Sequence, residues 1–466
     1  MNNKTLLDQE MFREYDIRGI TDSNLTPDIV YEIGKAFSTK MQSSGIQHVV
    51  TGRDGRLSSP AIEKSLSSGL QDGGSDVTTI GRVATPMLYY AAEKLSAGTG
   101  IMVTGSHNPP NYNGLKLMMG GKTLSGNSIQ EIYHIAKDKA SRDGSGSESE
   151  LSITSAYLNE IVDQIKLEKS LNVVVDCGNG VAGDFAPILL RRIGANVEEL
   201  YCEVDGSFPN HHPDPAEPTN LQDLIKSVKK NKADIGLAFD GDGDRLGVVT
   251  GCGKIIWPDK LMMLFTKQVL KETPHATIVS DVKCSMDLST VVERFHGNYI
   301  MWKTGHSHIK AKMSETDAML GGEFSGHICF RDKWYGYDDA LYSATRLLQI
   351  LANSTQTADQ IFEEFPKRCC TPEIKVPTTE SEKFKIMEDL IRNIDFPEAT
   401  INPIDGLRVE FENSWGLIRA SNTSPVLVLR FEAKTLKDIK DIQALFQQKL
   451  DEVRPGLTFK TSLGAE

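Results

Sequence analysis

The stretch Asp-Gly-Asp-Gly-Asp-Arg at residues 240–245 follows the apolar run 233–239 and places carboxylates at alternate positions. In an extended chain such positions lie about 6.6 Å apart, whereas oxygen ligands lie about 2.0–2.1 Å from a Mg²⁺ ion. Clustered carboxylates also repel one another unless a cation neutralises them. We therefore expect the chain to curl around Mg²⁺, with Gly241 and Gly243 permitting the necessary dihedral angles. The run 233–239 predicts a buried strand, so the loop lies where open α/β sheets bind ligands.

The predicted metal ligands are Asp240, Asp242 and Asp244, and two other interpretations of this loop compete with that one. A solvated acidic turn would carry the same residues. An EF-hand calcium loop begins with the same alternation but requires Gly at its sixth position and Glu at its twelfth. Arg245 and Gly251 stand at those positions, which excludes the EF-hand. A guanidinium beside a cation site indicates an anionic ligand that bridges both.

A second informative stretch is Thr-Gly-Ser-His-Asn-Pro at residues 104–109, directly after the short apolar run 100–103. Its small and turn-forming residues predict a tight loop. The hydroxyl of Ser106 lies near the start of this loop, and the ammonium of Lys116 follows ten residues later. Ser106 could instead be an ordinary turn or cap residue. The Gly-x-Ser-x-Gly spacing of a serine-hydrolase elbow is absent.

Four stretches, in order along the chain, resemble the motifs of the α-D-phosphohexomutase family. Residues 104–109 resemble the phosphoserine loop of that family, and residues 240–245 resemble its metal loop. Gly-Glu-Phe-Ser-Gly-His at 322–327 resembles its sugar-recognition loop, and Arg-Ala-Ser-Asn-Thr-Ser-Pro at 419–425 resembles its phosphate-binding loop. The resemblance covers nearly the whole chain, from about Tyr15 to Arg430, and is nearest to the bacterial phosphomannomutase/phosphoglucomutase group.

The domain organisation follows from length, from strand patterns and from this resemblance. A chain of 466 residues exceeds what one hydrophobic core serves. Apolar runs rich in β-branched residues, such as 172–175 and 277–279, fit α/β sheet strands covered by helices on both faces. The polar stretch 141–150 has the composition of a linker or exposed loop. The resemblance implies three tandem mixed α/β sheet domains and a C-terminal α+β domain around a central cleft, at residues 1–152, 153–253, 254–367 and 368–466.

The resemblance also assigns roles to individual residues. The residues assigned to catalysis are Ser106, Arg18, Lys116, His107 and His306. The residues assigned to substrate binding are Tyr15, Arg245, Lys283, Glu323, Ser325, Gly326, His327, Arg419, Ser421, Asn422 and Thr423. Ser106 is expected to carry a phosphate whose oxygen joins the aspartates around Mg²⁺. The general base stays open among Arg18, Lys116 and His306, of which histidine titrates in the easiest range. The segment 52–56 also resembles a family segment, which we interpret as scaffold.

Charge and composition narrow the partners. The net charge is −12 from 51 basic and 63 acidic side chains, which disfavours nucleic acid as a partner. An acidic protein can hold an anionic sugar phosphate only where its cations converge. Basic residues do occur in or beside the motifs of every predicted domain, namely Arg18, Lys116, Arg245, Lys283, Arg419 and Arg430.

The expected cellular location follows from features that the sequence lacks. There is no apolar run of about 18 residues for a membrane span and no secretory signal. The seven cysteines form no Cys-x-x-Cys pair. We expect a monomer in a reducing cytoplasm, with no membrane partner.

The resemblance implies reversible intramolecular phosphoryl transfer between the 1- and 6-hydroxyls of mannose or glucose phosphate. Phosphoserine, Mg²⁺ and a bound hexose 1,6-bisphosphate are the expected cofactor and intermediates, and closure by the C-terminal domain is expected to exclude water. Phosphoglucosamine mutase is one alternative, although Phe324 departs from the Gln usual there. A metal-dependent sugar phosphatase and a non-catalytic sugar-phosphate binding protein are two others. Epimer preference between glucose and mannose is not readable from these motifs.

Overall fold

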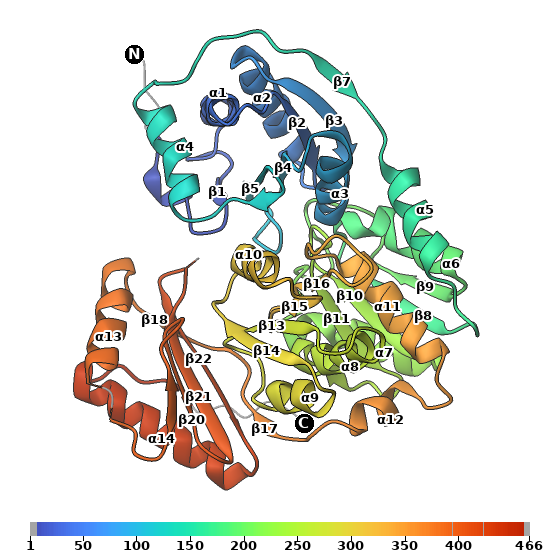
Figure 1. The fold of residues 1–466 in the computed structure, drawn as a ribbon, viewed down its shortest axis with the longest axis vertical. Helices are drawn as coiled ribbons and strands as arrows, with labels where there is room; N and C mark the ends of the chain where they lie inside the picture. Colours follow the sequence, from blue (N-terminus) through green and yellow to red (C-terminus); the bar gives the residue numbers. More distant parts are fainter. Residues whose placement is uncertain (1–6, 394, 423, 461–466) are drawn as a thin grey trace.

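The computed structural model describes residues 7–393, 395–422 and 424–460, and its strands form four sheets in chain order (Figure 1). The first sheet has the strand order β1-β5-β4-β2-β3-β7, with β6 paired to β5. Its strands are β1 (Ile17–Ile20), β2 (His48–Arg53), β3 (Asp76–Arg82), β4 (Gly100–Val103), β5 (Tyr112–Met119), β6 (Lys122–Thr123) and β7 (Glu148–Glu150). Its helices are α1 (Pro27–Ser43), α2 (Ser59–Asp72), α3 (Thr85–Leu95) and α4 (Asn127–Lys137).

Helices cover both faces of this first sheet, as the buried apolar strands predicted. Adjacent residues Val49 and Val50 on β2 belong to two different apolar clusters, because successive strand side chains point to opposite faces. The helices α1, α2 and α4 pack in one cluster, and α3 packs in the other. Pro86 in the first turn of α3 suits a helix start, since its missing N–H would have no partner there.

The second and third sheets are smaller. The second has the order β12-β11-β10-β8-β9 and the third β14-β13-β15-β16. The strands of the second are β8 (Asn172–Asp176), β9 (Asn196–Leu200), β10 (Ile235–Phe239), β11 (Leu246–Thr250) and β12 (Ile255–Ile256), with helices α5 (Thr154–Gln164), α6 (Ala186–Ile193) and α7 (Gln222–Asn231). The third contains β13 (Thr277–Asp281), β14 (Asn298–Trp302), β15 (Leu320–Gly322) and β16 (Ile328–Phe330), with α8 (Pro258–Glu272), α9 (Asp287–Arg294), α10 (His306–Thr316), α11 (Ala340–Ala352) and α12 (Ala358–Glu363).

In all three α/β sheets, the loop that contains a sequence motif lies between the same kinds of strand. A strand that runs parallel to one neighbour turns back into an antiparallel partner: β4 into β5, β10 into β11, and β15 into β16. The three turns contain residues 104–111, 240–245 and 323–327, and each holds one of the motifs found in the sequence. The sheets are therefore mixed, as expected, and each motif sits at the carboxyl end of a parallel strand.

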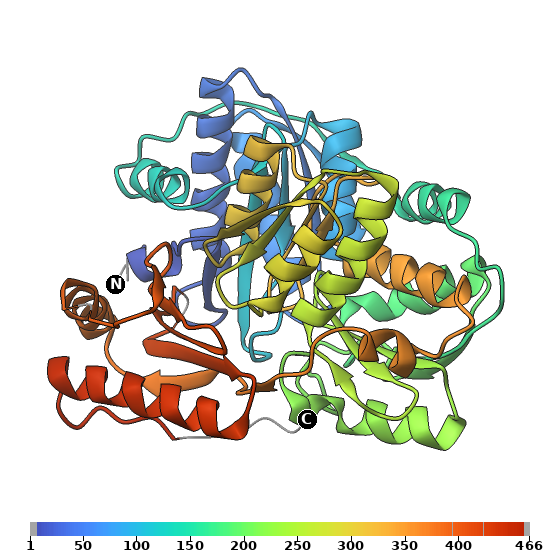
Figure 2. The ribbon, with the colours of Figure 1, turned by 60° about the horizontal axis from the view of Figure 1, so that its bottom comes forward.

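The C-terminal unit is an α+β domain. Its sheet has the order β17-β22-β21-β20-β19, with β18 also paired to β22, and every pairing is antiparallel. Its elements are β17 (Cys369–Cys370), β18 (Ile374–Pro377), β19 (Thr400–Asn402), β20 (Leu407–Glu410), β21 (Ser414–Ala420), β22 (Val426–Ala433), α13 (Glu380–Arg392) and α14 (Leu436–Val453). In Figures 1 and 2, α14 covers the outer face of this sheet, remote from the other domains.

Two segments near predicted domain boundaries take part in sheets, although the composition of the first predicts a linker or exposed loop and the second boundary follows from the resemblance. The polar stretch 141–150 ends in β7, which pairs in parallel with β3 and extends the first sheet. The exposed side chains of β7 give no apolar signal, because only its backbone joins the sheet. The strand β12 pairs with β11, so the second sheet continues past residue 253. No helix in the described part of the chain has the length and apolar content needed to cross a bilayer.

The apolar cores divide the chain in two. One cluster runs continuously through the first three domains, from Val50 to Phe365. The C-terminal sheet and its helices enclose a separate cluster, with Leu429 fully buried in it. Another small cluster joins Val282 of the third domain to Trp415 and Leu417 on the opposite face of the C-terminal sheet. The first three domains therefore form one packed body, against which the C-terminal domain rests.

Replacing Leu429 by Ala is expected to destabilise the C-terminal domain selectively. The substitution leaves a cavity in the separate core of that domain, which lowers the free energy of unfolding by about 2–5 kcal/mol. Differential scanning calorimetry should show one transition moving down while the other stays in place. Phe384→Ala, which shortens a half-exposed side chain of α13, is the matched control and should shift neither. Equal shifts of both transitions by Leu429→Ala would contradict the two-body division.

Candidate active site

A cavity of about 520 Å³ lies where the four domains meet. Its wall includes residues from the serine loop, from the sugar-recognition loop and from the C-terminal phosphate-binding loop. Of the residues predicted for the site, those that line this cavity are Tyr15, Arg18, Ser106, His107, Lys116, Arg245, Lys283, His306, Glu323, Ser325, His327, Arg419, Ser421 and Asn422. The three aspartates and Gly326 are not part of this wall, and Thr423 lies outside the described residues.

The serine loop brings Ser106 against the acidic loop. Ser106 is buried, has a left-handed φ of +47°, and its Oγ donates a hydrogen bond to Asp240 Oδ2 at 3.1 Å. Its backbone N–H donates to Thr104 Oγ1 at 2.8 Å, and His107 Nδ1 lies 3.2 Å from its Oγ. The Ser106 hydroxyl and the Asp240 carboxylate, 134 residues apart in sequence, are therefore in direct contact.

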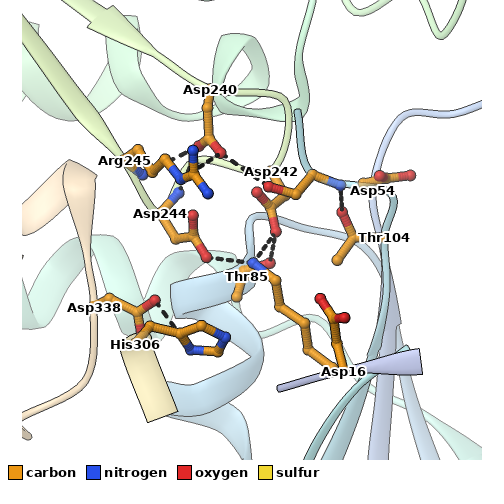
Figure 3. A network of polar contacts seen from close by, with 12 residues as sticks. Asp16, Asp54, Thr85, Thr104, Asp240, Asp242, Asp244, Arg245, His306 and Asp338 are labelled. Carbon is orange, nitrogen blue, oxygen red and sulfur yellow. Dashed lines mark hydrogen bonds and ion pairs between the residues drawn. The ribbon is translucent and has the colours of Figure 1, made fainter. Parts of the chain in front are cut away.

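The acidic loop curls as predicted. The Oδ1 atom of Asp240 accepts hydrogen bonds from the backbone N–H groups of Asp244 and Arg245, both at 3.1 Å. Gly243 has a φ of +76°, which favours glycine. Asp240, Asp242 and Asp244 are fully buried and offer oxygen atoms within 4.8 Å of one another (Figure 3).

The donor set around these carboxylates suits a hard divalent cation. Thr85 Oγ1 and Lys116 Nζ each donate to Asp242 Oδ2 at 2.6 Å, and Lys116 Nζ also donates to Asp244 Oδ2. The Oδ1 atoms of Asp242 and Asp244 are buried and have no hydrogen-bond partner among the described residues. Burial and the neighbouring carboxylates raise the pKa of Asp240 well above its usual range. Orphaned carboxylate oxygens on an all-oxygen set fit Mg²⁺.

Lys116 is a cation in this site. Burial would lower its pKa, but Asp242 and Asp244 outweigh burial, and the pKa lies above its ordinary value. The ammonium therefore stays protonated and unable to accept a proton. It offsets part of the charge of the buried aspartates.

Asp338 connects the histidines of the site, and sequence reasoning missed it. Its Oδ2 lies 2.9 Å from Nδ1 of His327 and 3.7 Å from Nδ1 of His306, and its Oδ1 accepts from Lys310 Nζ at 2.7 Å. Figure 3 shows Asp338 beside His306. The rings of His306 and His327 stack with centroids 5.3 Å apart. Burial, followed by Lys310, lowers the pKa of His306 well below its usual range, so this imidazole is neutral.

The basic and polar residues predicted for the substrate already have partners. Arg245 Nε donates to His327 Nε2 at 3.0 Å, and Arg419 makes a paired contact with Asp405 at 3.0 and 3.2 Å. Lys283 Nζ lies 2.8 Å from Glu373 Oε1. This hydrogen bond and these two ion pairs hold the cations in place at the cavity wall.

Tyr15 joins three domains around the cavity, while Glu323 is bound within the third domain. The buried Glu323 Oε1 accepts from the backbone N–H of Gly305 at 2.7 Å, and burial raises its pKa. Tyr15 OH donates to Thr304 O at 2.7 Å and accepts from Asn422 Nδ2, which links the first, third and C-terminal domains.

Several residues were missed or differ from expectation. Thr85 and Asp338 lie in no motif that indicates a functional site. The Thr-Pro pair at 85–86 and the Asp-Asp pair at 338–339 indicate only the start of a helix. Asp339 is indeed the N-cap of α11, and α3 begins at Thr85. Arg430 was counted among the converging cations, but it is buried behind the wall. It donates to Asp259 Oδ2 at 3.0 Å and lies over the ring of Phe324 at 3.6 Å.

Comparisons with known proteins match nearly the whole chain. Family models described as phosphoglucomutase/phosphomannomutase match in order: alpha/beta/alpha domains I, II and III at residues 9–143, 155–253 and 257–369, and the C-terminal domain at 373–449. A phosphomannomutase/phosphoglucomutase of Pseudomonas aeruginosa is 49% identical over 451 residues, 97% of each chain. A phosphoglucomutase of Neisseria gonorrhoeae is 47% identical, covering 95% of this chain and 97% of that one.

Solved structures give the same result. A phosphoglucomutase/phosphomannomutase family protein of Burkholderia thailandensis superposes with a TM-score of 0.93 at 43% identity, over 98% of this chain and all of that one. A phosphomannomutase-like structure from Thermus thermophilus, 22% identical with a TM-score of 0.80, shows the shared fold.

Mg²⁺ is expected to raise the thermal transition of the wild-type protein and to have little effect on Asp242→Asn. At a Mg²⁺ concentration about 100 times the Kd, binding to the folded state contributes about 2.7 kcal/mol. The quantity to compare is the Mg²⁺-induced shift, because neutralising one buried aspartate changes the starting stability. Asp359→Asn, at an acid that binds Thr250 outside the cavity, should respond like the wild type. An equal shift in all three proteins would place the cation elsewhere.

The Lys283–Glu373 pair is expected to contribute stability that depends on pH. Burial alone would raise the pKa of Glu373, but Lys283 outweighs it and lowers the pKa to about 2. A carboxyl with a lowered pKa stabilises the fold above its unfolded value and loses that contribution as pH falls towards its folded value. The difference in Tm between wild type and Glu373→Gln should therefore shrink from pH 6 to pH 3. Glu217→Gln, in the exposed pair with Lys375, is the control and should show little difference.

Proposed function

Because the chain belongs to the phosphoglucomutase/phosphomannomutase family, we propose that it moves a phosphoryl group between the 1- and 6-hydroxyls of glucose and mannose phosphates. The observation that carries this proposal is the 3.1 Å contact between Ser106 Oγ and Asp240 at the edge of a cavity with cations from all four domains. A nucleophilic hydroxyl, an acidic cation site and a basic wall are what phosphoryl transfer requires.

Ser106 is proposed to carry a phosphate in the active enzyme. A phosphoserine brings a charge of about −1.5 to −2, which Arg18, Lys116 and Arg245 on the cavity wall would balance. The Oγ–P bond then breaks as a new bond forms from phosphorus to the free hydroxyl of the hexose phosphate. The product is a hexose 1,6-bisphosphate, which turns over in the cavity and returns its other phosphoryl group to Ser106. Mg²⁺, held by the aspartates, would offset negative charge during transfer.

Proton transfer from the sugar hydroxyl requires a neutral acceptor. Lys116 is held protonated by two aspartates, and Arg18 Nε is paired with Asp16 at 2.6 Å. The stacked imidazoles of His306 and His327 line the cavity, and His306 is neutral. Both ring nitrogens of His327 already face partners, Arg245 and Asp338, so we assign the proton to His306, whose Nδ1 lies 3.7 Å from Asp338 Oδ2.

Substrate recognition is proposed to use the opposite part of the cavity. Glu323 and Ser325 would accept and donate hydrogen bonds to sugar hydroxyls, and would do so in either orientation of the bisphosphate. Arg419, Ser421 and Asn422 would hold the phosphate that is not reacting, since a guanidinium donates paired hydrogen bonds to phosphate oxygens. A rigid sugar loop supports this assignment: Phe324 stacks on Trp257 with centroids 5.6 Å apart.

Other expectations remain proposals. The seven cysteines are free thiols, which suits the predicted reducing cytoplasm. We also propose that the protein is a monomer and that its C-terminal domain closes over the cavity and excludes water. Phosphoglucosamine mutase stays the nearest rival and differs by its sugar loop, while a phosphatase would release inorganic phosphate.

The decisive variant is Ser106→Ala. Its turnover of glucose 1-phosphate should fall by about 10³-fold or more, because the phosphoryl carrier is lost, while calorimetric binding of glucose 1-phosphate persists. Ser96→Ala is the control, since that buried hydroxyl donates to backbone carbonyls on the far side of the first domain. Coupled assays on glucose, mannose and glucosamine 1-phosphates then separate the mutases. Undiminished turnover by Ser106→Ala, or stoichiometric release of inorganic phosphate by the wild type, would overturn the proposal.

A further inference from the structure

The segment 52–56, which sequence reasoning treated as scaffold, contacts the serine loop through one side chain. Arg56 is 1% exposed, and its guanidinium donates to four backbone carbonyls of that loop. The acceptors are the carbonyl oxygens of Ser106 at 2.7 Å, Asn108 at 2.6 Å, Pro109 at 2.6 Å and Tyr112 at 3.0 Å. The two terminal nitrogens of one arginine thus hold both limbs of the β4–β5 turn.

The same segment fixes the residue before the serine. Asp54 Oδ2 accepts from the backbone N–H of Gly105 at 3.2 Å and lies 3.3 Å from Arg56 Nε. A Cβ atom added at Gly105 would come within 2.5 Å of the guanidinium, so the loop and the arginine are in direct van der Waals contact. Asp54 thus binds the N–H group of Gly105, and Arg56 binds the carbonyl oxygen of Ser106. These two contacts lie on either side of the Ser106 backbone, whose φ is +47°.

The carbonyl of Ser106 is also where the acidic loop makes contact. A Cβ added at Gly241 would lie 2.4 Å from that oxygen, which shows how closely the two loops approach. Arg56 therefore binds the carbonyl that packs on the metal loop, while the side chain of the same residue reaches Asp240. The ring of Phe208, from the second domain, lies 5.1 Å from the guanidinium carbon and covers it.

We propose that Arg56 is a positioning residue for phosphoryl transfer, which holds Ser106 Oγ in line with the acidic cluster through its four carbonyl contacts. This inference rests on the proposed function. The planar fork of a guanidinium can serve four acceptors at once, whereas a lysine ammonium has three donors on a single atom. The geometry of the fork, beyond the positive charge, is what the loop requires.

The test compares Arg56→Lys and Arg56→Met with Arg53→Lys and Arg53→Met. Arg53 lies in the same segment and pairs with Glu63 at 3.0 Å, away from the serine loop. Each protein is phosphorylated with glucose 1,6-bisphosphate, the phosphoserine is quantified by mass spectrometry, and transfer to glucose 1-phosphate is followed in single turnovers below the thermal transition. Transfer per phosphorylated site should fall about 10²-fold in both Arg56 variants, with the Kd for glucose 1-phosphate unchanged. Both Arg53 variants should transfer at the wild-type rate.

Gly105→Ala is the second variant, used if the Arg56 variants do not fold. Its Cβ displaces the intact guanidinium, and it should show the same loss of transfer rate. Wild-type transfer by Arg56→Lys with loss only in Arg56→Met would show that charge alone matters and would overturn the inference, as would wild-type transfer by Gly105→Ala. An inactive Ser106→Ala beside a fully active Arg56→Lys rejects the role of Arg56 alone, whereas an active Ser106→Ala rejects the proposed function itself.

Discussion

Burial of three carboxylates at one point is the constraint on which the rest of the structure depends. Asp240, Asp242 and Asp244 have no exposed surface, so their repulsion must be offset by neighbours within the protein. Within the second domain, the backbone N–H groups of Asp244 and Arg245 donate to Asp240, and the Arg245 guanidinium lies 3.9 Å from the same carboxylate. The hydroxyl of Thr85 and the ammonium of Lys116 come from the first domain. The charge balance therefore requires the first two domains to be locked together, and their shared apolar core does this.

The C-terminal domain stands in a different relation to the site. It has its own core, and around the cavity it meets the first and second domains through polar contacts, Asn422 with Tyr15 and Lys375 with Glu217. Polar contacts of this kind separate at lower cost than a continuous apolar core. The proposed chemical half of the site is thus built into domains that share one core, while the predicted phosphate grip belongs to a domain with a core of its own.

The parts of this site that the sequence predicted are those encoded by local pattern. Gly241 and Gly243 between acids, and Ser106 in a loop of small residues, mark turns at strand ends that the structure contains. The parts it missed depend on contacts across the fold. Thr85 meets Asp242 over 157 residues and Arg56 meets the serine loop over about 50, and neither lies in a pattern that names its partner. The prediction that Arg430 faces the site was wrong for the same reason, because Arg430 is bound by Asp259, which lies 171 residues away in sequence.

The acidic character of the protein is compatible with an anionic substrate because of how its cations are paired. Arg419 with Asp405, and Lys283 with Glu373, hold positive groups at the cavity wall in fixed orientations. The two cations of these pairs are buried, so the phosphate of the proposed substrate would meet donors that are already aligned. A buried cation without a partner carries a large desolvation cost, whereas a cation paired with a carboxylate keeps its charge and its orientation. The net charge of −12 thus includes the acids that hold these cations of the cavity wall in place.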